Sequence, residues 1–187
     1  TNTFTGNTTI SAGTLEVGGF GSLGSGSYAG AIANAADLVV SSSLDQTLSG
    51  PISGTGQLLK SGFGKLILSG TNTYSGSTTL VGGALLVNGI NSGSGPLSTV
   101  FGTTLGGSGR IAADTTVGGL HSPGNSPGVQ TFGGNLSYQT GSNVLWELVA
   151  NTDAGRGTFF DGINVEGNLA FRGRLHHAGA EFRQLQR

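Results

Sequence analysis

Two aspartates in the C-terminal part of the chain have the side chains needed for acid–base chemistry. Asp153 and Asp161 flank one polar loop. Glycoside cleavage requires such a pair of carboxylates, one acting as general acid and the other as base or nucleophile. Aspartates beside glycine-rich turns also accept hydrogen bonds from backbone N–H groups. We favour the second interpretation, in which these side chains cap turns.

Histidines supply the other candidates for chemistry. His121 and Ser122 are residue types of a catalytic triad, but a triad is recognised by geometry, and this pair lies within a Pro-Gly turn motif. His176, His177 and Glu181 are residue types that bind zinc, although their spacing is weakly indicative. The G-G-x-G-x-D repeat that binds calcium in other β-rolls is missing. We therefore assign no catalytic residue, no metal ligand and no cofactor-binding residue.

Two glycine motifs resemble phosphate-binding loops. Residues 19–24 fit G-x-G-x-x-G, which must open a helix if it is to bind a dinucleotide, yet residues 25–30 show no helical period. Gly64 and Lys65 are followed by Leu66, where a phosphate loop requires Ser or Thr. The first motif is better interpreted as a turn in a repeat. The second motif does not match a phosphate-binding loop.

Bulk composition indicates a folded repeat protein. Glycine makes up 37 of 187 residues without the G-X-Y period of collagen, and only 9% of residues are charged. The net charge of −1 gives no electrostatic attraction to nucleic acid or to an acidic membrane surface. Cysteine is absent, so stability must come from something other than disulfides.

No apolar run is long enough to span a bilayer, and no charged-then-apolar leader opens the chain. Membrane insertion by this segment is therefore not expected. Because the chain begins in mid-repeat at Thr1, we expect a fragment whose leader or anchor lies outside it.

The stretch from Gly54 to Val87 must provide the scaffold, because it alternates short apolar patches with polar turns. Each patch is bounded by Gly, Ser, Asn or Thr, which favour turns. The predicted strands are Leu58–Leu59, Leu66–Leu68, Thr78–Leu80 and Ala84–Val87. These patches are too short for helices and too regular for a random loop, so they predict coils of a β-solenoid.

The chain also repeats itself. Residues 1–17 align without gaps on residues 71–87, a shift of 70 positions (71 − 1), and such self-similarity is typical of repeat architectures. The residues expected to point inward in the first copy are Phe4, Ile10, Leu15 and Val17. At about 20 residues per coil, eight or nine coils are expected.

Outside the repeats, further patches predict more coil sides. Leu105, Ile111 and Val117 recur at equal intervals, as sides of similar length would require. Residues 121–128 (HSPGNSPG) predict a sharp corner, since each Pro-Gly pair suits a type II turn. Residues 143–149 (NVLWELV) form the longest strand signal. Lys60 and Lys65 are expected to be solvated.

The last stretch, Arg172–Arg187, breaks the pattern. It carries four of the eight basic residues and two of the three histidines. One hypothesis is that a shift of reading frame has replaced native repeat sequence, and the other is a helical or disordered end. We treat residues 1–171 as the solenoid and 172–187 as an atypical tail.

The central stretch resembles the autotransporter-associated β-strand repeat of Gram-negative passenger regions. The residues that carry this resemblance are Gly54, Gly56, Leu58, Lys60, Gly62, Gly64, Leu66, Leu68–Gly70, Asn72–Gly76, Thr78, Thr79, Gly83, Leu85 and Val87. Residues 1–17 resemble the second half of another copy, and residues 122–128 and 160–171 resemble later passenger motifs.

The resemblance implies an all-β, right-handed parallel β-helix, a single-stranded solenoid, at or released from the cell surface. It implies that the C-terminal coils, residues 129–171, assist folding, which gives Trp146 and its neighbours a stabilising role. A C-terminal β-barrel or another anchor is then expected outside this sequence.

Two functions fit these observations. The first is a non-enzymatic structural or adhesive segment whose long Thr/Ser/Asn face makes weak contacts with surface glycans or proteins. The alternative is a carbohydrate-active β-helix, such as a polysaccharide lyase or hydrolase, which needs clustered Asp, Lys or Arg. Only Lys60, Lys65, Arg110 and Arg156 supply cations in the repeat region, so we favour the first.

Overall fold

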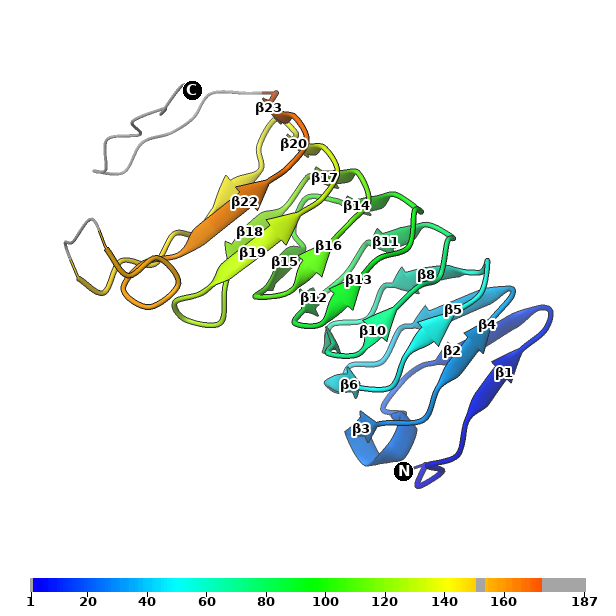
Figure 1. The fold of residues 1–187 in the computed structure, drawn as a ribbon. Helices are drawn as coiled ribbons and strands as arrows, with labels where there is room; N and C mark the ends of the chain where they lie inside the picture. The colour runs from blue at the N-terminus through cyan, green and yellow to red at the C-terminus, as the bar shows by residue number, and fades with distance from the viewer. Residues whose placement is uncertain (1, 151–153, 173–187) are drawn as a thin grey trace.

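The chain winds into a three-sided stack of parallel strands, which confirms the predicted all-β parallel β-solenoid (Figure 1). The structure, a computed structural model, describes residues 2–150 and 154–172. Within that part of the chain no α-helix occurs, and one short 3-10 segment, η1 (Leu23–Gly26), interrupts the strands. No helix within it is long and apolar enough to cross a membrane.

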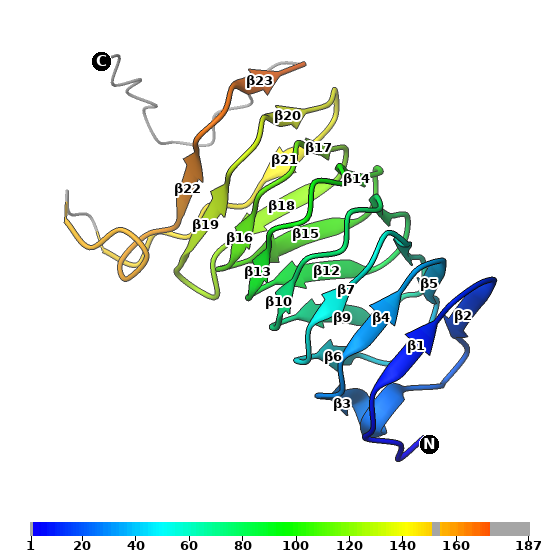
Figure 2. The same cartoon turned by 45° about the vertical axis from the view of Figure 1, so that its right-hand side comes forward.

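Each turn of the stack contributes one strand to each of three sides, called A, B and C in chain order. Side A comprises a three-stranded sheet of β1 (Thr8–Ile10), β4 (Ile32–Asn34) and β7 (Ile52–Ser53), followed by a five-stranded sheet of β10 (Thr71–Asn72), β13 (Ile90–Asn91), β16 (Arg110–Ile111), β19 (Val129–Phe132) and β22 (Gly162–Val165). In Figure 2 side A lies in front of side C.

Sides B and C are single continuous sheets. Side B contains β2 (Thr14–Val17), β5 (Asp37–Val40), β8 (Gln57–Lys60), β11 (Thr78–Leu80), β14 (Leu97–Thr99), β17 (Thr115–Val117), β20 (Leu136–Tyr138) and β23 (Leu169–Phe171). Side C contains β3 (Ser27–Tyr28), β6 (Gln46–Leu48), β9 (Lys65–Leu68), β12 (Ala84–Val87), β15 (Thr104–Gly107), β18 (Leu120–Pro123) and β21 (Asn143–Val144). All four strands predicted between Gly54 and Val87 are therefore present.

The described residues form seven three-stranded turns and an eighth that contributes only β22 and β23, compared with the eight or nine coils expected. Thr78 pairs with Leu58 and with Leu97, so these turns are 20 (78 − 58) and 19 (97 − 78) residues long. Leu136 pairs with Leu169, a turn of 33 (169 − 136). This last turn is longer because it contains the connection between β21 and β22, whose described parts, residues 145–150 and 154–161, extend outward from the stack in both views (Figures 1 and 2).

Alternate residues of every side fill one interior column, as strands with a period of two require. The predicted trio Leu105, Ile111 and Val117 lies on sides C, A and B of one turn, and all three are buried. The largest fully buried apolar side chains are Tyr28, Phe132, Ile32, Leu38, Leu48, Ile52, Leu58, Leu66, Leu68, Leu80 and Leu85.

One inward prediction for the first repeat is wrong. Ile10 and Val17 are buried and Leu15 packs partly against the core, but Phe4 is exposed. Its repeat counterpart Tyr74 is buried. The described residues include no turn that stacks before Phe4, whereas Tyr74 has a turn on either side.

The predicted strand over residues 143–149 is also largely wrong. Only Asn143–Val144 forms β21, and Trp146, Leu148 and Val149 are exposed. Among the described residues, β21 is the edge strand of side C and pairs with β18 alone. Without a further side C strand beyond it, this apolar segment leaves the sheet.

Candidate functional site

The aspartate singled out for acid–base chemistry is a buried turn-capping residue. Asp161 precedes β22 and is fully buried. Its Oδ1 accepts a hydrogen bond from the backbone N–H of Gly128 at 2.9 Å, and its Oδ2 accepts one from Glu147 N–H at 2.8 Å. These contacts agree with the favoured interpretation, in which the aspartate caps turns. Its proposed partner, Asp153, lies outside the described residues.

His121 and Ser122 cannot act as a base–nucleophile pair. Both lie in β18 rather than in the turn where they were predicted, and neighbouring strand residues point to opposite faces. His121 is fully buried, whereas Ser122 lies on the outer face. The turn itself begins at Gly124, whose φ of 88° requires glycine. The predicted corner is therefore present but shorter, and only its first Pro-Gly pair has the positive-φ glycine of a type II turn, because Gly128 lacks a positive φ.

The His121 ring belongs to a closed polar network inside the last turns. Nδ1 lies 2.5 Å from the Tyr138 hydroxyl oxygen, and Nε2 lies 2.8 Å from Oε1 of Gln130. Gln130 Nε2 donates to the carbonyl oxygen of Gly106 at 2.9 Å. Burial lowers the pKa of His121 to about 4 and raises the pKa of Tyr138. Both groups are therefore neutral at pH 7.

Lys60 is buried, which contradicts its predicted solvation. Its side chain is fully enclosed at the end of β8, and Nζ donates to the carbonyl oxygens of Gly62 and, at 3.2 Å, of Gly82. Burial lowers the pKa of Lys60. The ammonium group thus satisfies backbone carbonyls from two successive corners. Lys65 is exposed as predicted and lies 3.2 Å from Asp45.

A second buried polar cluster spans sides A and B. Asn72 Nδ2 donates to Oδ1 of Asn91 at 2.7 Å, and Asn72 Oδ1 accepts the backbone N–H of Ile52 at 3.0 Å. The Tyr74 and Thr78 hydroxyl oxygens are 2.6 Å apart. Because each group is hydrogen-bonded to a neighbour, this cluster offers no free group for chemistry.

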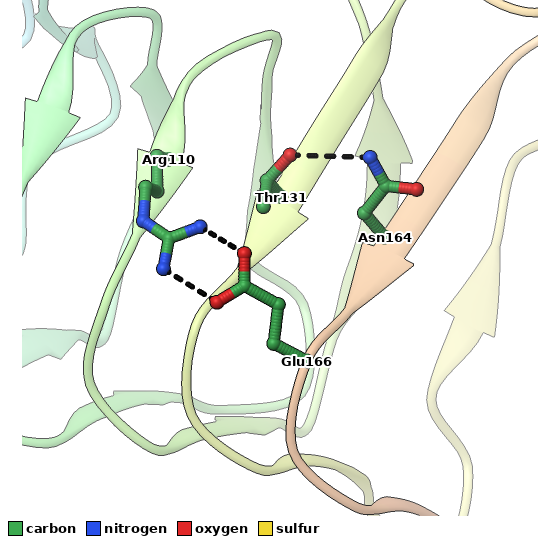
Figure 3. A network of polar contacts seen from close by, with 4 residues as sticks. All are labelled: Arg110, Thr131, Asn164 and Glu166. Atoms are coloured by element: carbon green, nitrogen blue, oxygen red, sulfur yellow. Dashed lines mark hydrogen bonds and ion pairs between the residues drawn. The ribbon is translucent and has the colours of Figure 1, made fainter.

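Charged and polar residues cross-link the last turns on the outside of side A. Arg110 on β16 makes two hydrogen bonds to the carboxylate of Glu166, at 2.5 and 2.7 Å (Figure 3). Asn164 on β22 donates to Thr131 on β19 at 3.5 Å. The ion pair raises the pKa of Arg110 and lowers that of Glu166. These contacts stabilise neighbouring turns, because every member comes from a different strand or connection.

The remaining sequence candidates form no site. Residues 19–24 run into the short 3-10 segment η1 and then β3 rather than into an α-helix, so the dinucleotide-binding geometry is absent there. Among the described residues, no group of three His, Cys, Asp or Glu side chains could hold a metal ion. His176, His177 and Glu181 lie outside those residues.

The feature best placed for contact with other molecules is a column of hydroxyl side chains on the outer face of side B. Thr79, Ser98, Thr116 and Ser137 pair in register through four successive strands. All four are partly or fully exposed. This hydroxyl column is part of the polar face predicted from the sequence.

Parallel stacking, inward apolar columns and an outer polar face define a β-solenoid repeat protein. The family model described as passenger-associated-transport-repeat matches residues 1–17 and 58–87. Similarity also extends to the adhesin BmaC autotransporter of Brucella suis biovar 1 (strain 1330), with 38% identity over 135 residues, which cover 69% of this chain. The chain spans about 4% of the length of that relative. No solved structure matches this chain.

The chain is therefore part of an autotransporter passenger region built from these repeats. It belongs at the cell surface or outside the cell of a Gram-negative bacterium. Both statements confirm the resemblance found in the sequence.

Proposed function

We propose that this segment is a non-enzymatic adhesive stalk, which holds a long polar surface away from the cell. The observation that carries the proposal is the hydroxyl column of Thr79, Ser98, Thr116 and Ser137, repeated in register along one face. The similar Brucella protein is named an adhesin.

The hydroxyl column suits weak, repeated contacts. Each hydroxyl group both donates and accepts hydrogen bonds, and adjacent groups are about 4.8 Å apart, the spacing of neighbouring strands. Several weak contacts to one extended partner reinforce one another because later contacts form at high effective concentration. Surface glycans and proteins offer such partners.

The adhesive role can be tested with beads coated with the chain and applied to cultured cells and to abiotic surfaces. A variant combining Thr79→Val, Ser98→Ala, Thr116→Val and Ser137→Ala should reduce attachment. The matched control, Ser53→Ala with Thr71→Val, removes exposed hydroxyls from side A and should leave attachment unchanged. Equal attachment by both variants, or no attachment by the native chain, would refute this proposal.

The geometry of Asp161 favours the non-enzymatic function over the polysaccharide lyase or hydrolase. Both of its oxygens are engaged by backbone N–H groups and neither is exposed. A panel of polysaccharide substrates should therefore give no turnover. Turnover that disappears in Asp153→Ala or Asp161→Ala would reverse this preference.

We also infer that the C-terminal turns assist folding. Ring contacts within these turns support the inference. The ring centroids of His121 and Phe132 are 5.5 Å apart, and those of Tyr138 and Phe171 are 4.9 Å apart and stacked. Refolding kinetics test this inference. Phe132→Leu should slow refolding more than Leu58→Ala for an equal loss of stability, since nucleus residues control the folding rate. The opposite order would contradict it.

A further inference from the structure

Apolar side chains gather on one corner of the solenoid. Between residues 5 and 143, the exposed large apolar residues other than Ile90 all lie in connections from side B to side C, here called the B–C corner. These residues are Phe20, Leu44, Phe63, Val81, Val100 and Phe101. Five successive turns each expose at least one such side chain.

The three phenylalanines are regularly spaced. Phe20 follows β2, Phe63 follows β8 and Phe101 follows β14, so the rings occur on every second turn. They are 82%, 90% and 81% exposed. Two turns of a parallel stack correspond to about 10 Å. The corner therefore carries a row of three rings, the Phe row, along the solenoid axis.

The surroundings of the Phe row are polar but uncharged. In the connections that form the B–C corner, the single charged residue is Asp45, which is paired with Lys65 at 3.2 Å. Beyond Phe101 the corner continues into a shallow hollow, whose lining includes Thr103, Thr104 and Asn143. A ligand on this corner meets apolar ring faces, hydroxyl and amide groups, and no net charge.

We propose that the Phe row binds an extended, neutral β-1,4-linked polysaccharide lying along the solenoid axis. Sugar rings present C–H groups on their faces and hydroxyls at their edges, and the C–H groups complement the negative face of an aromatic ring. In an extended β-1,4-linked chain the same face returns with every second sugar, a length close to two turns of this stack. This inference goes beyond the proposed function, because the Phe row lies on a different surface from the hydroxyl column.

The shape of the corner favours a linear polymer over a second copy of the chain. A stable protein interface buries a broad area of about 800 Å² on each partner. The Phe row is a ridge about one side chain wide: Gly62 and Gly64 flank Phe63, and the two intervening turns contribute the smaller side chains of Leu44 and Val81. A narrow row with a fixed repeat matches a chain of sugars.

The test is calorimetric titration of the 187-residue chain with cellohexaose, a neutral β-1,4-linked glucan. Maltohexaose, its α-1,4-linked counterpart, controls for linkage geometry. We expect binding of the first and at least about fivefold weaker binding of the second. Each of Phe20→Ala, Phe63→Ala and Phe101→Ala should weaken binding by about fivefold. The triple variant should abolish it.

Two control variants test whether binding depends on the position and on the aromatic character of the rings. Ile90→Ala, which removes an exposed apolar side chain outside the B–C corner, should bind like the native chain. Phe63→Trp should retain binding because it keeps an aromatic face. Since the three rings are almost fully exposed, circular dichroism and thermal unfolding of the variants should match those of the native chain.

The outcomes separate this inference from the adhesive function. Attachment of native beads without cellohexaose binding, or equal binding by the triple variant, overturns the glycan site and leaves adhesion standing. A Phe-dependent change in oligomeric state without glycan binding overturns it in favour of self-association. Glycan binding that is lost in the triple variant supports it, whether or not the beads attach to the chosen cells.

Discussion

Nδ1 of His121 lies 2.5 Å from the hydroxyl oxygen of Tyr138, in a space closed to solvent. Because the Gln130 amide nitrogen donates to Gly106, the amide oxygen of Gln130 must face His121. We therefore assign the proton to Nε2 and acceptance of the Tyr138 O–H to Nδ1. This network is satisfied only when the imidazole is neutral.

Acid should destabilise the C-terminal turns through His121. Its folded-state pKa of about 4 lies below the ordinary value of 6.5, so between these values the unfolded chain binds more protons than the native one. The contribution of His121 is complete above pH 6.5 and is lost as the pH falls towards 4. This difference corresponds to about 3 kcal/mol.

Urea unfolding at pH 7 and pH 4.5, followed by fluorescence, measures this loss. His121→Gln removes the titrating ring and should flatten the pH dependence relative to the native chain, although it lowers stability at pH 7. The slope of the unfolding free energy against pH is compared between the variant and the native chain. The difference reports His121 alone, because carboxylates such as Glu166, whose pKa is lowered by Arg110, are present in both. An unchanged slope in His121→Gln would contradict the assignment.

Replacement of Lys60 should cost far more than replacement of Lys65. Lys60→Met refills the buried volume but leaves the carbonyl oxygens of Gly62 and Gly82 without their donor, at a cost of about 2 kcal/mol. Lys65→Met removes an exposed ion pair and should change stability by less than about 0.5 kcal/mol. Urea midpoints of the two variants make the comparison, and equal midpoints would show that Lys60 is not buried.

Asp161 should stabilise the long connection between β21 and β22. Asp161→Ala leaves the buried N–H group of Gly128 and the partly buried N–H group of Glu147 without an acceptor. We expect a loss of about 2–4 kcal/mol and faster proteolysis between residues 145 and 160. Asp161→Asn keeps one acceptor oxygen and should lose less. Asp37→Ala, a surface control bonded to Gln57, should leave the proteolysis pattern unchanged.

Two glycines separate the effect of backbone conformation from that of stacking. Gly13 and Gly54 both have positive φ, 75° and 105°. A Cβ atom at Gly13 meets nothing within 4 Å, whereas one at Gly54 would lie 2.1 Å from the Asn34 carbonyl oxygen of the preceding turn. Gly13→Ala should cost about 1 kcal/mol and Gly54→Ala at least about 3 kcal/mol. Similar thermal midpoints would contradict the close stacking.

The stacked architecture could be predicted because its signals are local. The apolar patches of residues 54–87 and the equal intervals of Leu105, Ile111 and Val117 each report one side of a coil, and a coil contacts chiefly its neighbours. The turn-capping role of Asp161 also follows from a local preference for backbone N–H groups.

The residues whose positions were predicted wrongly are placed by contacts between turns. The local pattern of apolar and polar residues does not report such contacts. Lys60 is charged, yet carbonyls from two corners enclose its ammonium group. Phe4 is apolar, yet no described turn stacks before it, and the segment beginning at Leu145 leaves an edge strand. The Phe row emerges only when corners from distant parts of the sequence are stacked.

The unequal turns, from 18 residues between Leu97 and Thr115 to 33 between Leu136 and Leu169, leave the ladder of side B unbroken. Corner length and strand register are thus separate variables in this fold. A peptide epitope or a small folded module grafted at the connection between β21 and β22 can therefore be carried as cargo while the strands on either side keep their partners.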